Sequence, residues 1–94
     1  LELCLVAQEL GAALAPTPFG STVYLVAEAL LRAGSEAQRA ALLPDIATGA
    51  RIGALAVVER RTALTPQSIE TTFANGVLNG RKLAVPDGGV ANLL

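Results

Sequence analysis

A change in the spacing of apolar side chains near residue 49 constrains the fold of this chain more than any other feature. Before it, apolar residues recur every three or four positions, which is the period of an amphipathic helix. After it, they form short runs separated by Asn-Gly pairs, which are typical of strands and tight turns. This order predicts an α+β chain of about three N-terminal helices followed by antiparallel strands, with a boundary between residues 1–49 and residues 50–94.

The helical half begins with two predicted helices. The first spans residues 1–15 and ends at Pro16, because proline lacks the amide donor that a helix needs. Its apolar face consists of Leu3, Val6, Leu10, Ala13 and Leu14. The second helix spans residues 22–33, and we expect Ser21 to be its N-cap and Gly34 its left-handed C-terminal residue.

A third helix is predicted from a capping box. Ser35 and Gln38 stand three residues apart, so each side chain can satisfy the backbone amide of the other. The apolar side of this helix consists of Leu42, Leu43 and Ile46. Pro44 within it predicts a kink or a broken last turn, and Gly49 ends the helical half.

The second half contains four predicted strands. They are residues 52–58, 69–74, 81–86 and 90–94. Asn75-Gly76 and Asn79-Gly80 are predicted turns, because Asn and Gly tolerate positive φ. Pro86 and the residues after it end the third strand.

The composition is apolar for so short a chain. Of 94 residues, 52% are hydrophobic and 16% are charged. A small domain buries a limited share of its surface, so much of this apolar surface needs cover. Both ends, Leu1 and the apolar residues 90–94, read as cuts through a larger structure. We therefore expect a fragment that associates with other chains and is inactive alone.

Charge and residue types exclude several functions. A net charge of -1 without a basic patch argues against nucleic-acid binding, and the absence of histidine argues against the common metal sites. Prolines and glycines interrupt the uncharged residues 10–27, so we expect no membrane span. No secretory signal is evident, which predicts a cytoplasmic location. The single cysteine, Cys4, has apolar neighbours and is predicted to be buried.

Chemistry-bearing residues are sparse, and none is a candidate catalytic residue. Glu59 follows the predicted strand 52–58. A carboxylate there either reaches water, caps a loop or faces a pocket. Gly88-Gly89 is a tight turn rather than a phosphate-binding loop, because no glycine fingerprint opens a helix there.

Several stretches resemble the acyl-CoA dehydrogenases. They are GSEAQR at 34–39, LP at 43–44, TGARIGA at 48–54 and GVLNGRK at 76–82, with further similarity over residues 8–16 and 85–93. The resemblance covers nearly the whole chain. It implies that residues 1–49 form the end of the family's N-terminal helical domain and that residues 50–94 begin its middle β domain.

The resemblance also implies a reaction. Members of this family use FAD to dehydrogenate an acyl-CoA thioester between its α and β carbons, and they work as homo- or hetero-oligomers. The cofactor carries the redox chemistry and the protein positions it. The family's catalytic base lies in a C-terminal helical bundle, so the resemblance places no catalytic residue in this chain.

Positions that contact the flavin in the family fall here on Leu55, Val57, Val58, Ala84, Val85 and Pro86. The sequence departs from the family pattern at these positions. Val58 replaces a threonine whose hydroxyl meets the flavin, which removes a hydrogen bond worth about 0.5–1.5 kcal/mol. Ala84 replaces an aromatic residue, and residues 60–65 lack the glycines of the family's loop. Glu59 keeps the family's residue type.

Three functions therefore stay open. The first is an enzyme that holds FAD through backbone amides. The second is a degenerate, non-catalytic subunit that supports an active partner, as occurs in the family in steroid and side-chain degradation. The third is an unrelated α+β interaction module.

Overall fold

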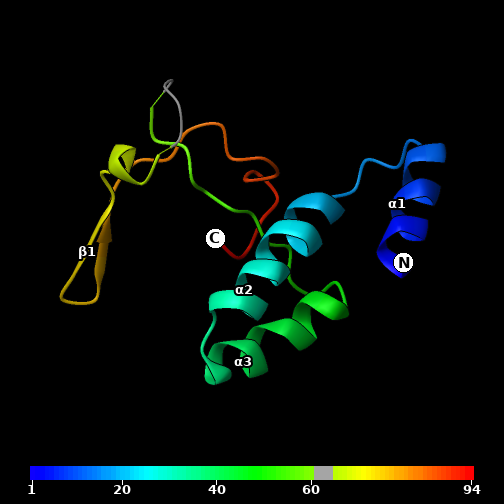
Figure 1. The fold of residues 1–94 in the computed structure, drawn as a ribbon, viewed down its shortest axis with the longest axis horizontal. Coiled ribbons are helices and arrows are strands. Elements are labelled where there is room, and N and C mark those ends of the chain that lie inside the picture. The colour runs from blue at the N-terminus through cyan, green and yellow to red at the C-terminus, as the bar shows by residue number, and fades with distance from the viewer. Residues whose placement is uncertain (61–64) are drawn as a thin grey trace.

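The computed structural model describes residues 1–60 and 65–94, and within them helices precede a β-hairpin (Figure 1). The elements are α1 (Glu2–Ala12), η1 (Gly20–Ala27), α2 (Glu28–Ala33), α3 (Glu36–Ala47), η2 (Pro66–Ser68), β1 (Thr72–Ala74) and β2 (Val77–Asn79). The π-helix η1 continues directly into α2, so the two form one helical rod. The predicted α+β class, with three helical segments before antiparallel strands, is confirmed.

The start of α3 follows the sequence prediction. Ser35 Oγ accepts a hydrogen bond from the Gln38 amide at 3.2 Å, and Gln38 Oε1 accepts one from the Ser35 amide at 2.9 Å. The predicted broken last turn is wrong, because α3 runs through Pro44 to Ala47. Its C-terminal end is stabilised by the Thr48 amide, which donates to the Pro44 carbonyl at 3.1 Å. Gly49 ends the helical half as predicted, with φ of +76°.

Two predicted helix boundaries are wrong in the first third of the chain. α1 ends at Ala12, short of Pro16, and Leu14 adopts a left-handed conformation with φ of +48°. Ser21 lies inside the rod rather than at its N-cap. Its buried hydroxyl donates to the carboxylate of Asp87 instead, so a contact across the chain replaces the expected local one.

Gly34 is also not left-handed. Its φ of -70° and ψ of 145° are those of extended backbone. A Cβ at this position would lie 2.5 Å from the carbonyl oxygen of Leu30, in the last turn of α2. Glycine therefore fits here because of close backbone approach, and positive φ plays no part.

The core is small and sits where the rod, α3 and the segment after Gly49 meet. Among the described residues, the buried apolar side chains are Val26, Ile46 and Ala54, with exposed fractions of 8%, 8% and 1%. The rod packs against α3, while α1 stands apart from both (Figure 1). No residue of α1 is buried, and Cys4 is exposed, contrary to its predicted burial. The hydroxyl of Tyr24 donates to the carbonyl of Leu3 at 3.0 Å and tethers α1 to the rod.

The hairpin turn follows the prediction. β1 and β2 pair antiparallel, with Ala74 opposite Val77. Asn75 and Gly76 connect them with φ of +51° and +76°, the conformation for which this pair is favoured. The strand is shorter than the predicted 69–74, and its side chains are exposed, Phe73 to 73%.

The second predicted turn, at Asn79-Gly80, is wrong. Asn79 is the last residue of β2, and neither residue has positive φ. A Cβ on Gly80 would collide with the side chain of Thr71, so crowding between the hairpin's two ends accounts for the glycine.

The remaining predicted strands, 52–58, 81–86 and 90–94, do not form a sheet. Gly53 and Leu93 make an isolated parallel bridge, supported by the Ala54 amide donating to the Leu93 carbonyl at 2.9 Å. Ala84 and Asp87 have φ of +49° and +57°, which turns the chain away from a strand path. Single points of contact therefore replace the continuous ladders that the sequence predicts.

Candidate functional site

One backbone hydrogen bond links the predicted flavin-contacting residues 55–58 to Leu83, the residue directly before the predicted contacts 84–86. The amide of Leu83 donates to the carbonyl of Val58 at 2.7 Å. This bond brings Val58 next to Leu83, although 25 positions separate the two residues in the sequence. Ala84, directly after Leu83, is left-handed with φ of +49°, and no further backbone hydrogen bond between these residues follows it.

The six predicted contact residues present apolar side chains without a polar atom. Leu55, Ala84 and Pro86 are exposed. Val57, Val58 and Val85 are half-buried. Such side chains can cover the face of a planar ring by dispersion, but they cannot orient it through a hydrogen bond.

The backbone of the same segments offers hydrogen-bond donors. The amides of Leu55, Val57 and Val58 donate to no other residue that the structure describes, and the same holds for the amides of Ala84 and Val85. A ring system with acceptor atoms along its edge, such as a flavin, fits this combination of backbone donors and apolar side chains. The residues present would thus hold it through the backbone alone.

Glu59 is the charged group nearest to this contact. Its side chain is 6% exposed, and its carboxylate accepts from the Thr71 amide at 3.0 Å and from Lys82 Nζ at 2.5 Å. The Glu70 amide and the Thr71 hydroxyl donate to the same carboxylate. Of the three readings of Glu59, the loop cap is confirmed, because these bonds occupy the carboxylate in place of water.

The partners of Glu59 also set its ionisation. The hydrogen bond from Lys82, followed by that from the Thr71 hydroxyl, holds the pKa of Glu59 below its ordinary value. Burial acts in the opposite direction and is outweighed. Glu59 is therefore a carboxylate anion at neutral pH, which suits a structural anchor better than a general base.

Polar contacts with the helical half fix the start of the first segment. Thr22 Oγ1 accepts from the Gly53 amide at 3.1 Å and donates to the Gly53 carbonyl at 3.2 Å. Asn92 Oδ1 accepts from the Ile52 amide at 2.9 Å. Sequence reasoning missed both contacts. The one available signal was Thr22, a polar residue within an otherwise apolar helical stretch.

An open apolar groove of about 390 Å³ lies between α1, the rod, the end of α3 and the residues that follow it. Val6 and Leu10 of α1 form one wall, and Val23 and Ile46 contribute to the others. Arg51 lines the groove, but its guanidinium pairs with the carboxylate of Asp45 at 3.0 Å. The groove is therefore mainly apolar, and Thr17, Thr22 and Arg51 are its polar lining residues.

Metal-ligand clusters and membrane-spanning helices are both absent from residues 1–60 and 65–94, which the structure describes. In these ranges, no three His, Cys, Asp or Glu side chains gather as a metal site would require. No helix in them combines the length and the apolar character needed to cross a membrane. The residues of the predicted loop at 61–64 lie outside the described residues.

Comparison with known proteins identifies the helical half. The family model for the N-terminal domain of acyl-CoA dehydrogenases matches residues 1–50. The chain belongs to the acyl-CoA dehydrogenase family. The match spans α1, the rod and α3 and ends just after Gly49, while residues 51–94 lie outside it. No curated protein and no solved structure matches this family member.

Proposed function

We propose that this chain is part of a flavin-dependent acyl-CoA dehydrogenase that oxidises an acyl-CoA thioester between its α and β carbons. In this proposal residues 1–49 form the end of the N-terminal helical domain, and residues 50–94 form the start of the middle β domain. Family membership supports the oxidoreductase class, and the family is generally FAD-dependent. A homo- or hetero-oligomer would supply the remaining surfaces.

The observation that carries the proposal is the contact between Val58 and Leu83. The 2.7 Å hydrogen bond joins Val58, a position that the family resemblance assigns to the flavin, to Leu83, the residue directly before the assigned positions 84–86. Within the described part of the chain, the amides of Leu55, Val57, Val58, Ala84 and Val85 have no protein acceptor, which leaves them available to a ligand. Backbone donors survive side-chain substitution, so the replacements at Val58 and Ala84 are compatible with a bound ring.

FAD, when bound, would accept a hydride from the β carbon of the thioester while a base removes the α proton. The residues of this chain would bind the ring edge and exclude water from one side through Leu55, Val57 and Val85. None of them is a proton acceptor, so the base belongs to another part of the enzyme.

The visible absorption spectrum of the purified full-length protein tests this proposal. Flavin bands that bleach on anaerobic addition of an acyl-CoA are the expected result. A colourless protein that fails to bind added FAD would overturn it.

A substitution at Val58 tests whether this residue contacts the flavin. Val58→Thr restores a hydroxyl, and we expect it to tighten FAD binding roughly threefold to tenfold, the value of one added hydrogen bond. Val90→Thr is the matched control, because Val90 is exposed and lies outside both segments. Equal effects of the two substitutions would argue against flavin contact at Val58.

A second candidate function is a non-catalytic subunit that supports an active partner. The observation that favours it is the absence of any polar side chain among the six contact residues, together with the left-handed backbone at Ala84. Co-purification of a colourless chain with a yellow family member would support it. Full flavin occupancy in the full-length protein, purified without a partner, would exclude this second function.

A further inference from the structure

We infer that Glu59 is a positioning residue, which sets the spacing of the two predicted flavin-binding segments through Lys82. This inference rests on the proposed function for its consequence, although the contacts themselves do not depend on it. Glu59 comes directly after Val58, and Lys82 comes directly before Leu83.

The Glu59–Lys82 pair and the Val58–Leu83 bond form two adjacent cross-links. Lys82 Nζ lies 2.5 Å from Glu59 Oε1, and the Leu83 amide lies 2.7 Å from the Val58 carbonyl. One cross-link uses side chains and the next uses the backbone, so they clamp the same point of the two segments. Loss of the ion pair would leave a single hydrogen bond to hold residues 55–58 against residues 83–86.

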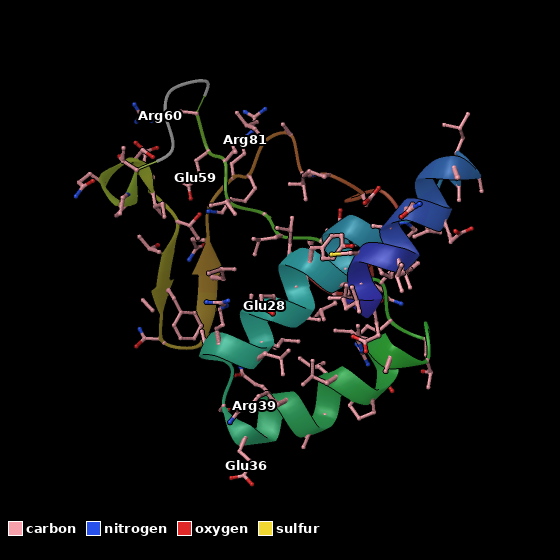
Figure 2. All side chains as sticks on the ribbon, turned by 45° about the vertical axis from the view of Figure 1, so that its right-hand side comes forward. Glu28, Glu36, Arg39, Glu59, Arg60 and Arg81 are labelled. Carbon is pink, nitrogen blue, oxygen red and sulfur yellow. The ribbon has the colours of Figure 1, made fainter. Side chains whose placement is uncertain are left out.

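Glu59 also fixes where the hairpin begins. Its carboxylate accepts from the backbone amides of Glu70 and Thr71, just before β1, while Lys82 follows β2. One carboxylate therefore anchors both the residues that enter the hairpin and the residues that leave it. Figure 2 shows Glu59 near Arg60 and Arg81. Because Glu59 is 6% exposed, water cannot readily replace these donors.

Two neighbouring ion pairs show which cation binds the Glu59 carboxylate. Arg60 forms an ion pair with Glu70, on the entry side of the hairpin. Lys82 is the cation that pairs with Glu59 itself. Among the described residues, the carboxylate is thus held by one cation and by backbone and hydroxyl donors. Protonation would weaken its role as an acceptor.

Hydrogen exchange and FAD titration of the full-length protein test the inference. We compare Glu59→Gln and Lys82→Met with Glu36→Gln, which removes an exposed carboxylate from α3. We expect Glu59→Gln and Lys82→Met to speed exchange at the Leu83 amide and to raise the Kd for FAD roughly tenfold, as loss of a charged hydrogen bond does. Glu36→Gln should change neither.

Further measurements separate positioning from general stability. The double variant should weaken FAD binding no more than the weaker-binding single variant, because both substitutions remove one shared contact. The pKa of Glu59 lies below its ordinary value, so its contribution is present above that ordinary value and is lost as pH falls through the lowered one. The difference between the original protein and Glu59→Gln should therefore vanish in acid.

The outcomes distinguish the inference from the proposed function. Unchanged exchange at Leu83 in Glu59→Gln and Lys82→Met overturns the inference whether or not FAD binds. Faster exchange at the Leu83 amide in these variants, with unchanged FAD affinity, overturns the positioning role. Glu59 would then only anchor the hairpin. A protein that binds no FAD refutes the proposed function, and the exchange at Leu83 still decides whether Glu59 holds the segments together.

Discussion

The helical half and the second half of the chain are organised by different interactions. The helices are set by signals close in sequence, such as the capping box of Ser35 and Gln38. The segments after Gly49 are held by hydrogen bonds between distant residues, such as Thr22 with Gly53 and Asn92 with Ile52. The second half therefore depends on partners elsewhere in the chain, whereas the start of α3 is fixed by residues of its own first turn.

The largest expected effect comes from the junction between the halves. Gly53 packs against Val26, and a Cβ on Gly53 would lie 2.8 Å from the Val26 side chain. Because valine is stiff and Val26 is buried, we expect Gly53→Ala to lower the free energy of unfolding by about 3 kcal/mol. Urea unfolding measures it, with Gly11→Ala as the control, since a Cβ on Gly11 meets nothing within 4 Å. Similar stabilities for the two variants would show that the halves do not pack together here.

The hydrogen bonds at the same junction should matter slightly less. Thr22→Val keeps the side-chain shape but leaves the amide and carbonyl of the buried Gly53 without their partner. We expect a loss of about 2 kcal/mol in the free energy of unfolding. Thr72→Val, on the exposed face of β1, should change it by less than about 0.5 kcal/mol. A negligible effect of Thr22→Val would mean that packing alone joins the halves.

The same division explains what the sequence could predict. The α3 capping box, the end of the helical half at Gly49 and the Asn75-Gly76 turn are local patterns, and all are confirmed. The prediction of a left-handed Gly34 was wrong. In a sequence, a glycine required by close approach of the backbone looks the same as one required by positive φ. The residue types alone do not separate these two causes.

The strands and the site show the limit of local reasoning. The sequence predicted a strand at 52–58, but a strand needs neighbours along its length, and Gly53 finds one only at Leu93 among the described residues. The resemblance named Val58 and residues 84–86, and the structure bonds Val58 to Leu83, directly before them. It gave no sign that Thr71 and Lys82 would surround Glu59, because those contacts span 12 and 23 positions.

A smaller effect tests the local character of the helical half. Ser35→Ala removes the side chain that accepts from the Gln38 amide, and we expect a loss of about 1 kcal/mol. Ser35→Asp retains an acceptor and should keep most of the stability. Helix content by circular dichroism and urea unfolding together measure the effect. Equal loss in both variants would show that the contact with α2, rather than the cap, sets the start of α3.

The smallest effect concerns the one local signal in the second half. Gly76 has φ of +76°, which an alanine adopts only under strain, so Gly76→Ala should weaken the hairpin. Because both strands are exposed, the hairpin can open locally, and this limits the loss of global stability to under about 1 kcal/mol. Hydrogen exchange of the Val77 and Asn79 amides should reveal the change more clearly than unfolding does. Gly89→Ala is the control, since Gly89 has neither positive φ nor a close neighbour. If Gly76→Ala instead destabilised the whole molecule as much as Gly53→Ala, the hairpin would be part of the folding core and the contrast between the two halves would not hold.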